Sequence, residues 1–281
     1  MHTGLLVLVT VVWGSTFVVI KDTVSSVNPF FIVFTRCLLA ALPIFLLQTF
    51  KNPDSLFSKM VMIRGGILGI LLAATHITQT IGLQYTSTGH SAFITGSAVV
   101  FVPMILLLVF RKRLNLSDIL SMCIILTGLF LLTYDVETRI NIGDLITLIT
   151  AVSCALHLVI SGRFVKKTDA AGIIAWQFAI AGLASFLGFL ASGASGISLT
   201  VKSVGAIIYL GLLGTLFCYF IMVWVQQYVS SMLVVIIFSL EPVFASIFGF
   251  LILGETLNGS EFVGAVLVLV GVLLYQLYRN Q

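Results

Sequence analysis

The chain is a succession of apolar segments, each about as long as a membrane is thick, separated by short polar connections. Ten segments reach this length, at about 4–21, 29–50, 62–85, 89–110, 116–134, 142–162, 170–192, 203–227, 230–253 and 260–278. A helix needs roughly 20 mostly apolar residues to cross the hydrocarbon core. Because a backbone in lipid must satisfy its own hydrogen bonds, we predict an all-α integral membrane protein with ten transmembrane helices.

The segments form two similar halves related by a constant offset of 143 residues. QYTS at 84–87 matches QYVS at 227–230, and LNLSD at 114–118 matches LNGSE at 257–261. Each half contains five predicted helices, and five is odd, so the second half enters the bilayer inverted relative to the first. We therefore predict two inverted repeats, at 1–138 and 139–281. This architecture is common among secondary transporters, with a substrate site between the halves.

Basic residues are distributed unevenly between the two sides that this topology defines. Three of them, Lys21, Arg139 and Lys202, fall on the side away from the termini. Ten fall on the side of the termini: Lys51, Lys59, Arg64, Arg111, Lys112, Arg113, Arg163, Lys166, Lys167 and Arg279. Because positive charge is retained in the cytoplasm, we predict cytoplasmic termini and a multi-pass protein of a cell membrane, such as a bacterial inner membrane. The formal net charge of +4 thus reflects topology and indicates no nucleic-acid partner.

Composition and motifs indicate no cofactor and no catalytic residue. Hydrophobic residues make up 59% of the 281 positions, which leaves no segment for a soluble domain. The four cysteines lie within predicted helices and outside any Cys-x-x-Cys spacing, so we expect buried thiols. His76 and His157 have no evident third partner for a metal ion. Gly-x-Ser-x-Gly, His-Glu-x-x-His and P-loop motifs are absent, so a membrane-embedded enzyme is a remote alternative.

Two prolines interrupt predicted helices at similar depths in the two halves. Pro103 lies in the fourth helix and Pro242 in the ninth. A proline removes one backbone donor and can kink its helix. Kinked helices in corresponding positions of two repeats indicate moving parts beside a substrate site.

Several local motifs occur in a characteristic order along the chain. WGSTF at 13–17 is followed by NPF at 28–30 and by Arg36, and QYTST at 84–88 precedes AFI at 92–94. The ninth segment contains LEPVFA at 240–245 before LGETL at 253–257. With ten helices in two halves, the whole chain resembles the drug/metabolite transporter superfamily in its EamA group.

The resemblance implies ten helices in two inverted repeats around a central cavity. It also implies transport of small metabolites, often the export of amino acids or related compounds. In that family the first repeat usually ends its fourth helix with a glutamate similar to Glu255. Here the aligned position is Lys112, so a role that needs a symmetric pair of glutamates is not expected.

Ionisable side chains within hydrocarbon are expensive and are therefore candidates for function. Glu241 precedes Pro242 in the ninth helix, and Arg36 lies in the second. The two residues could form a structural ion pair or make separate hydrogen bonds to the backbone. Alternatively, Glu241 is a charge or proton switch that couples transport to protons, or it contacts a charged group of the substrate. Arg36, which is nearer a helix end, could instead extend to the interface.

Polar side chains of the third, sixth and eighth helices are candidates for a cavity wall. His76 and Gln79 lie one turn apart, so they share a helix face. The offset relates His76 to Tyr219, and it relates His157 to Gly14, beside Trp13. Inverted symmetry would place these residues around one cavity, although a histidine in a membrane helix is more often a packing group.

Trp13 and Trp176 lie within helices, whereas most membrane tryptophans lie at the interface. Each is either packed in the core or a wall for an aromatic or cationic substrate. Thr16 lies close to Trp13 in the first helix. The predicted substrate-binding residues are Trp13, Thr16, His76, Gln79, His157, Trp176 and Tyr219.

Together these features favour a secondary transporter whose two repeats rock around a central cavity. An amino acid or a related compound, moved by export, is the leading expectation. Uptake of choline or another organic cation through an aromatic box of Trp13 and Trp176 is the alternative. The expected partners are the small-molecule substrate, the lipid bilayer and protons as a candidate coupling ion. The sequence leaves a homodimer open.

Overall fold

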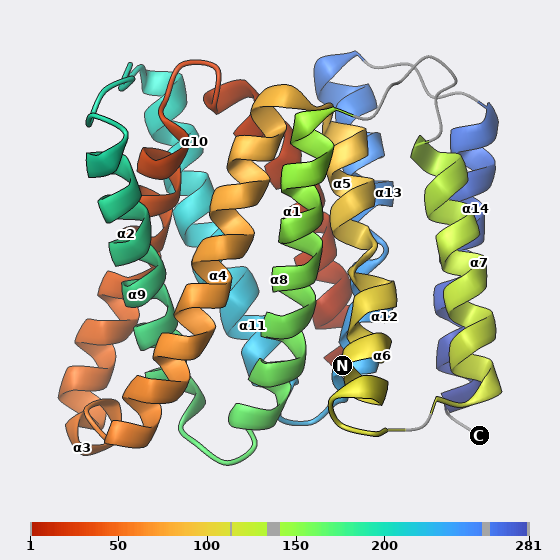
Figure 1. Ribbon diagram of the computed structural model, residues 1–281, viewed down its shortest axis with the longest axis horizontal. Coiled ribbons are helices and arrows are strands. Elements are labelled where there is room, and N and C mark those ends of the chain that lie inside the picture. Colours follow the sequence, from red (N-terminus) through yellow and green to blue (C-terminus); the bar gives the residue numbers. More distant parts are fainter. Residues whose placement is uncertain (1, 113, 134–140, 255–258, 280–281) are drawn as a thin grey trace.

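The computed structural model describes residues 2–112, 114–133, 141–254 and 259–279, and these are almost entirely helical (Figure 1). Within these ranges nine helices are long and apolar enough to cross a membrane, so the chain is a multi-pass membrane protein. Six are uninterrupted: α1 (His2–Thr23), α2 (Pro29–Lys51), α4 (Lys59–Tyr85), α8 (Ile142–Phe164), α9 (Ala170–Ala191) and α14 (Gly259–Arg279). Three are composite: α5 (Thr88–Gly96) with α6 (Ala98–Leu108); α10 (Val201–Gly211), η1 (Leu212–Phe217) and α11 (Cys218–Val225); and α12 (Ser231–Phe238), α13 (Glu241–Phe248) and η2 (Gly249–Leu253).

The remaining predicted segment is α7 (Leu116–Thr133), whose apolar stretch Leu116–Leu132 is shorter than the other nine. A single turn, α3 (Pro53–Leu56), joins α2 to α4. Some sequence features lie outside the described residues, namely Glu255, Arg113, Arg139, the first part of the LNGSE motif and the repeat boundary at 138/139.

Successive long helices run in opposite directions, so the first and last of them begin and end at the same end of the bundle (Figure 1). We call this the termini end, and it holds His2, α3 and Arg279. The other end, which we call the opposite end, holds Thr23 and Ala191. An isolated antiparallel bridge between Val27 and Ile197 connects two loops there.

The repeated QY-x-S motif has the same structural role in both halves, because its serine is a helix N-cap. Ser87 accepts a hydrogen bond from the amide of His90 at 3.2 Å at the start of α5. Ser230 accepts one from the amide of Leu233 at 3.3 Å at the start of α12. A side-chain oxygen at this position satisfies a backbone donor that has no partner within the helix. The repeat in the sequence therefore marks equivalent helix starts.

The fourth and ninth predicted spans are each broken near the middle of their length. In the ninth, α12 ends at Phe238 and Pro242 opens α13, as expected for a residue that leaves the carbonyl four positions earlier without a donor. In the fourth, however, the break is at Ser97, and α6 continues through Pro103. The interruption of the fourth span therefore lies at Ser97, and Pro103 lies inside α6.

A serine accompanies each break. The hydroxyl of Ser97 donates to the carbonyl of Ile94 at 2.5 Å, and that of Ser239 donates to the carbonyl of Ile236 at 2.6 Å. Hydroxyls that bond back to the preceding turn bend helices. Gly96 also faces the Pro242 ring, since a Cβ there would lie 2.9 Å from Pro242 Cγ. The two broken helices thus contact each other at their breaks.

The eighth predicted span contains a π-helical segment, η1, between α10 and α11. The hydroxyl of Thr215 donates to the carbonyl of Leu210, five residues earlier, at 2.8 Å. Such segments contain one extra residue per turn, which rotates the side chains that follow, and they are frequent at functional sites. This segment faces α1 and α2 in the interior of the bundle.

Two glycines of α4 allow close approach to α9. A Cβ on Gly69 would lie 2.7 Å from Ile180 Cβ and 2.9 Å from the carbonyl oxygen of Gln177, and Gly65 faces Trp176 in the same way. This is the small-xxx-small packing expected of helices in lipid. Gly66, on another face of the same helix, has no atom within 4 Å of an added Cβ.

Replacing Gly69 with valine is expected to destabilise the protein by about 1–3 kcal/mol, because α4 and α9 must separate to admit the side chain. Gly66→Val is the matched control, since it adds the same β-branched side chain to the same helix in open space. Thermal unfolding in detergent measures both. Equal loss of stability in the two variants would contradict this view of the α4–α9 contact.

Candidate functional site

A small cavity lies inside the bundle where α1, α2, α4, α5, α8, α11 and α13 converge. Its volume is about 30 Å³, far below the roughly 300–1,000 Å³ of a typical small-molecule site. Its walls are formed by Trp13, Thr16, Arg36, Thr75, His76, Gln79, Thr95, Cys154, Tyr219 and Glu241. The cavity is therefore lined by polar side chains but is nearly closed.

Tyr219 is the centre of the aromatic part of this wall. Its ring centroid lies 5.1 Å from that of Trp13, 5.5 Å from that of His76 and 5.6 Å from that of His157. Trp13 also packs edge-on against Phe238 at 4.9 Å, and its indole Nε1 donates to the carbonyl of Gly214 at 2.8 Å. These contacts fix the ring of Trp13 between α11 and α12 and against η1.

Arg36 is held by the π-helical segment. Its side chain is 1% exposed, and its Nε donates to the hydroxyl of Thr215 at 2.8 Å. The Nη1 atom is buried without a hydrogen-bond partner. A buried cation that lacks an anion is energetically costly. Because Arg36 is buried within the bundle, it does not extend to the membrane interface.

Glu241 also lines the cavity, but it does not pair with Arg36. The described residues contain two ion pairs, His90 with Asp144 and Lys202 with Asp22, and neither includes Arg36 or Glu241. The direct pair that the sequence suggested is therefore absent from this structure. Two groups of opposite charge face one cavity without contact.

The two buried histidines differ in their hydrogen bonding. His76 is 3% exposed, and neither ring nitrogen has a hydrogen-bond partner in the described part of the chain. The Nε2 of His157 donates to Oε1 of Gln177 at 3.0 Å, and it contacts the cavity only through Tyr219. His76 is thus the histidine with free capacity to bind a ligand.

Trp176 lies away from the cavity, contrary to the sequence-based expectation. Its indole Nε1 donates to the carbonyl of Leu56 at 2.8 Å, and its ring packs edge-on against Phe45 at 5.2 Å. It anchors α3 at the termini end. Trp13 and Trp176 therefore do not form an aromatic box.

The structure brings together seven residues that the sequence had singled out and adds others. Those that line the cavity are Trp13, Thr16, Arg36, His76, Gln79, Tyr219 and Glu241. Thr95 and Cys154 on the wall, and Thr215 and Gln177 behind it, were missed as site residues. Gln177 follows Trp176 directly in α9. The sequence would have indicated Gln177 if the inward face of this helix had been assigned one residue later. Nothing in the sequence pattern reveals Thr215, because η1 interrupts the helical period.

Hydrogen bonds close the bundle at the opposite end. The Nζ of Lys21 donates to the carbonyls of Leu83 at 2.7 Å and Thr86 at 2.8 Å, which ties α1 to the end of α4. The hydroxyl of Thr86 donates to Oδ1 of Asp144 at 2.5 Å, and His90 lies 3.7 Å from the same oxygen. The ends of α1, α4, α5 and α8 are thereby connected.

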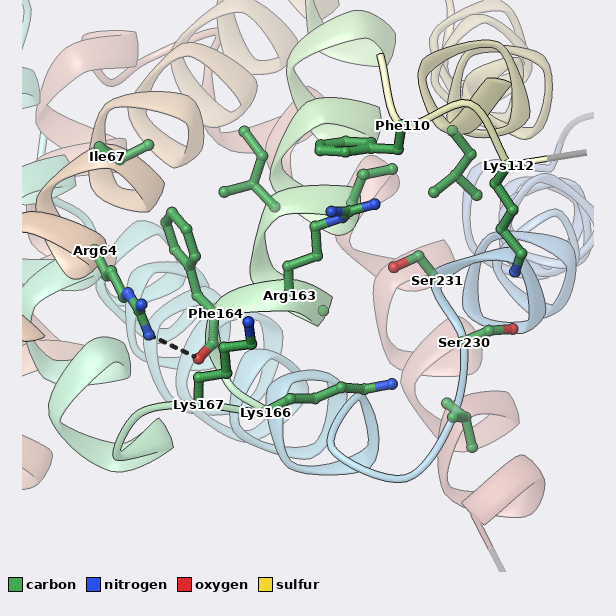
Figure 2. Close-up of a pocket in the computed structure, with 15 residues that line it drawn as sticks. Arg64, Ile67, Phe110, Lys112, Arg163, Phe164, Lys166, Lys167, Ser230 and Ser231 are labelled. Atoms are coloured by element: carbon green, nitrogen blue, oxygen red, sulfur yellow. Dashed lines mark hydrogen bonds between the residues drawn. The ribbon is translucent and has the colours of Figure 1, made fainter. Parts of the chain in front are cut away.

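At the termini end the bundle is open instead. A pocket of about 720 Å³ lies between the start of α4, the ends of α6 and α8 and the start of α12 (Figure 2). We call it the basic pocket, after its cationic side chains Arg64, Lys112, Arg163, Lys166 and Lys167. The bundle is thus tied together by hydrogen bonds at the opposite end and has a wide pocket at the termini end.

Comparison with known proteins agrees with this architecture. The model of the EamA-like transporter family matches twice, at residues 3–134 and 141–277. An uncharacterized transporter of Archaeoglobus fulgidus is 30% identical over 278 residues, which are 97% of this chain and 84% of that protein. A probable amino-acid metabolite efflux pump of Salmonella typhimurium is 27% identical, over 95% of this chain and 92% of the pump.

A solved crystal structure superimposes on this one with a TM-score of 0.80 at 15% identity, and covers 98% of this chain and 96% of its own. At that identity the likeness concerns the fold. The two family matches, which together span nearly the whole sequence, carry the assignment. The chain belongs to the EamA-like transporter family.

Proposed function

We propose that the protein is a secondary transporter for a small zwitterionic metabolite, of the amino-acid class, which it exports. Ten helices would form two inverted repeats, 1–138 and 139–281, that expose the central cavity to each side in turn. Both termini would be cytoplasmic, since the basic residues gather at the termini end. Membership of a transporter family supports this, as does the name of the Salmonella relative.

The observation that carries the proposal is the unpaired state of Arg36 and Glu241. Both line one cavity, both lack an ion-pair partner, and Arg36 has a buried donor without an acceptor. A substrate with a carboxylate and an ammonium group would satisfy the two at once, by charge-assisted hydrogen bonds. The aromatic wall of Trp13 and Tyr219 would then receive an apolar side chain.

Glu241 would also couple transport to protons. In the empty cavity Glu241 forms no ion pair, so we expect its location within the membrane to favour the neutral carboxyl group. The arriving ammonium group favours the carboxylate, so binding of substrate releases a proton. A carrier that holds either a proton or a substrate exchanges one for the other across the membrane, which would drive export.

Counterflow in proteoliposomes tests the substrate class. We expect vesicles preloaded with a neutral amino acid to accumulate the labelled compound. The corresponding amine, which lacks the carboxylate, and the corresponding carboxylic acid, which lacks the ammonium, should exchange about tenfold more slowly, because each leaves one buried charge unpaired.

Choline is the fourth solute to test, because it distinguishes an amino-acid carrier from an organic-cation carrier. Exchange of choline and of the amine at the rate of the amino acid would replace this proposal with an organic-cation carrier that uses Trp13 and Tyr219 as its aromatic wall. Absence of exchange with every amino acid would exclude the amino-acid class.

A further inference from the structure

The basic pocket at the termini end has an unbalanced charge. Five cationic side chains line it, from α4, the end of α6, the end of α8 and the loop after α8, and no carboxylate is among its lining residues. Figure 2 shows Lys112 and Lys166 extending toward Ser230 and Ser231 at the start of α12. Like charges gathered in a concave surface create a strongly positive potential that attracts anions.

Membrane topology alone does not explain this arrangement. The positive-inside rule requires basic residues at one end of the bundle, but it does not require them to converge. Of the eight basic side chains that the structure describes at the termini end, five line the pocket. Lys51, Lys59 and Arg111 lie at the same end and do not line it.

Two of the five cationic side chains are held in place by contacts with neighbouring residues. The guanidinium of Arg163 lies 3.3 Å from the ring centroid of Phe110, which is a cation–π contact. Arg64 lies 5.1 Å from the ring centroid of Phe164 and donates to that residue's carbonyl and to the hydroxyl of Thr168. An anion that binds here therefore meets positioned donors, which lowers the entropic cost of binding.

The wall above the cations is apolar. Ile67, Leu106 and Ile160 line the same pocket on the side of the membrane interior. Cations at the rim and apolar side chains deeper in the bundle match a molecule with an anionic head and a hydrocarbon tail. A phosphate group fits the cations best, because it offers several oxygens to arginine, lysine and serine donors.

We propose that the basic pocket is a binding site for a phosphate group, and that the headgroup of an anionic phospholipid occupies it. A free phosphate ester shares the headgroup's chemistry, and the apolar wall favours the lipid. The inference is independent of the substrate of the central cavity. A lipid in this position would contact the start of α4, the end of α8 and the start of α12.

Native mass spectrometry of the full chain, titrated in detergent with phosphatidylglycerol or with inorganic phosphate, tests the site. We expect the double variant Arg163→Gln/Lys166→Gln to bind phosphatidylglycerol about thirtyfold more weakly than the unmodified protein. Each loss of 1.4 kcal/mol in binding free energy lowers the affinity by roughly one order of magnitude. The matched control is Lys51→Gln/Lys59→Gln, which removes two charges from the same end outside the pocket. It should retain its affinity within about twofold.

Each outcome decides between the alternatives. Specific loss of phosphatidylglycerol in the pocket variant supports the lipid site. Saturable binding of inorganic phosphate, lost in the pocket variant, without phosphatidylglycerol binding would keep the phosphate site and exclude the lipid. Equal loss in both double variants, or no binding of either ligand, would overturn the proposal.

Discussion

Replacing Arg36 with glutamine is expected to reduce amino-acid exchange about a hundredfold, the largest effect of any single substitution in the cavity. The guanidinium would be the only cation available to the substrate's carboxylate among the described residues that line the cavity. Without the guanidinium, the carboxylate loses its water shell and gains no partner of opposite charge. In a buried site this costs about 2–5 kcal/mol. Counterflow of the amino acid identified in proteoliposomes measures the change.

Stability separates this effect from misfolding. Arg36 is buried without an anion, so its neutral replacement removes an uncompensated charge and should not lower the unfolding temperature. Lys202→Gln is a suitable control, because Lys202 is an exposed cation paired with Asp22 at the opposite end. Full exchange by a folded Arg36→Gln protein would contradict the role of Arg36 in substrate binding.

The second large effect is expected from Glu241→Gln, which should abolish the response of transport to a pH gradient. If proton and substrate move in opposite directions, uptake into vesicles is faster when the lumen is more acidic than the medium. Glutamine cannot release a proton, so this stimulation should fall at least about tenfold, since the pH gradient would act on transport through the titration of Glu241. Uptake at matched pH on both sides would be slower than normal but measurable, because the amide of the glutamine side chain still offers a hydrogen-bond acceptor to the ammonium.

Glu261 provides the contrast to Glu241, since it lies in the first turn of α14, outside the cavity lining. Glu261→Gln should keep the response to the gradient. A Glu241→Gln protein that accumulates substrate in response to a pH gradient as the unmodified protein does would exclude Glu241 as the proton site.

Hydropathy predicted the positions of the long helices within a few residues, because every span must bury its backbone and requires about 20 apolar residues. The constant offset between the two QY-x-S motifs also predicted equivalent positions, and both serines prove to be N-caps. The break at Ser97 was not predicted. A serine hydroxyl bonded to the preceding turn lies at the break, but Ser15 makes the same bond within the uninterrupted α1, so a serine in the sequence does not by itself indicate a break.

The candidate site was predictable where helix faces are regular. His76 and Gln79 follow the helical period, and both line the cavity. Trp176 was expected in the cavity wall but bonds to Leu56 instead, whereas its neighbour Gln177 bonds to His157. A rotation of about 100° separates neighbouring residues of a helix, and no pattern in α9 fixed its orientation. Thr215 could not be found, because the extra residue in η1 changes which side chains face Arg36, and π-helical segments leave no clear mark in the sequence.

The smallness of the empty cavity has a consequence for how a solute would enter it. A volume of about 30 Å³ is far below the roughly 300–1,000 Å³ of a typical small-molecule site. An amino acid bound among Trp13, Arg36 and Glu241 would therefore require the surrounding helices to move apart, so substrate binding and a change in helix packing would be one event.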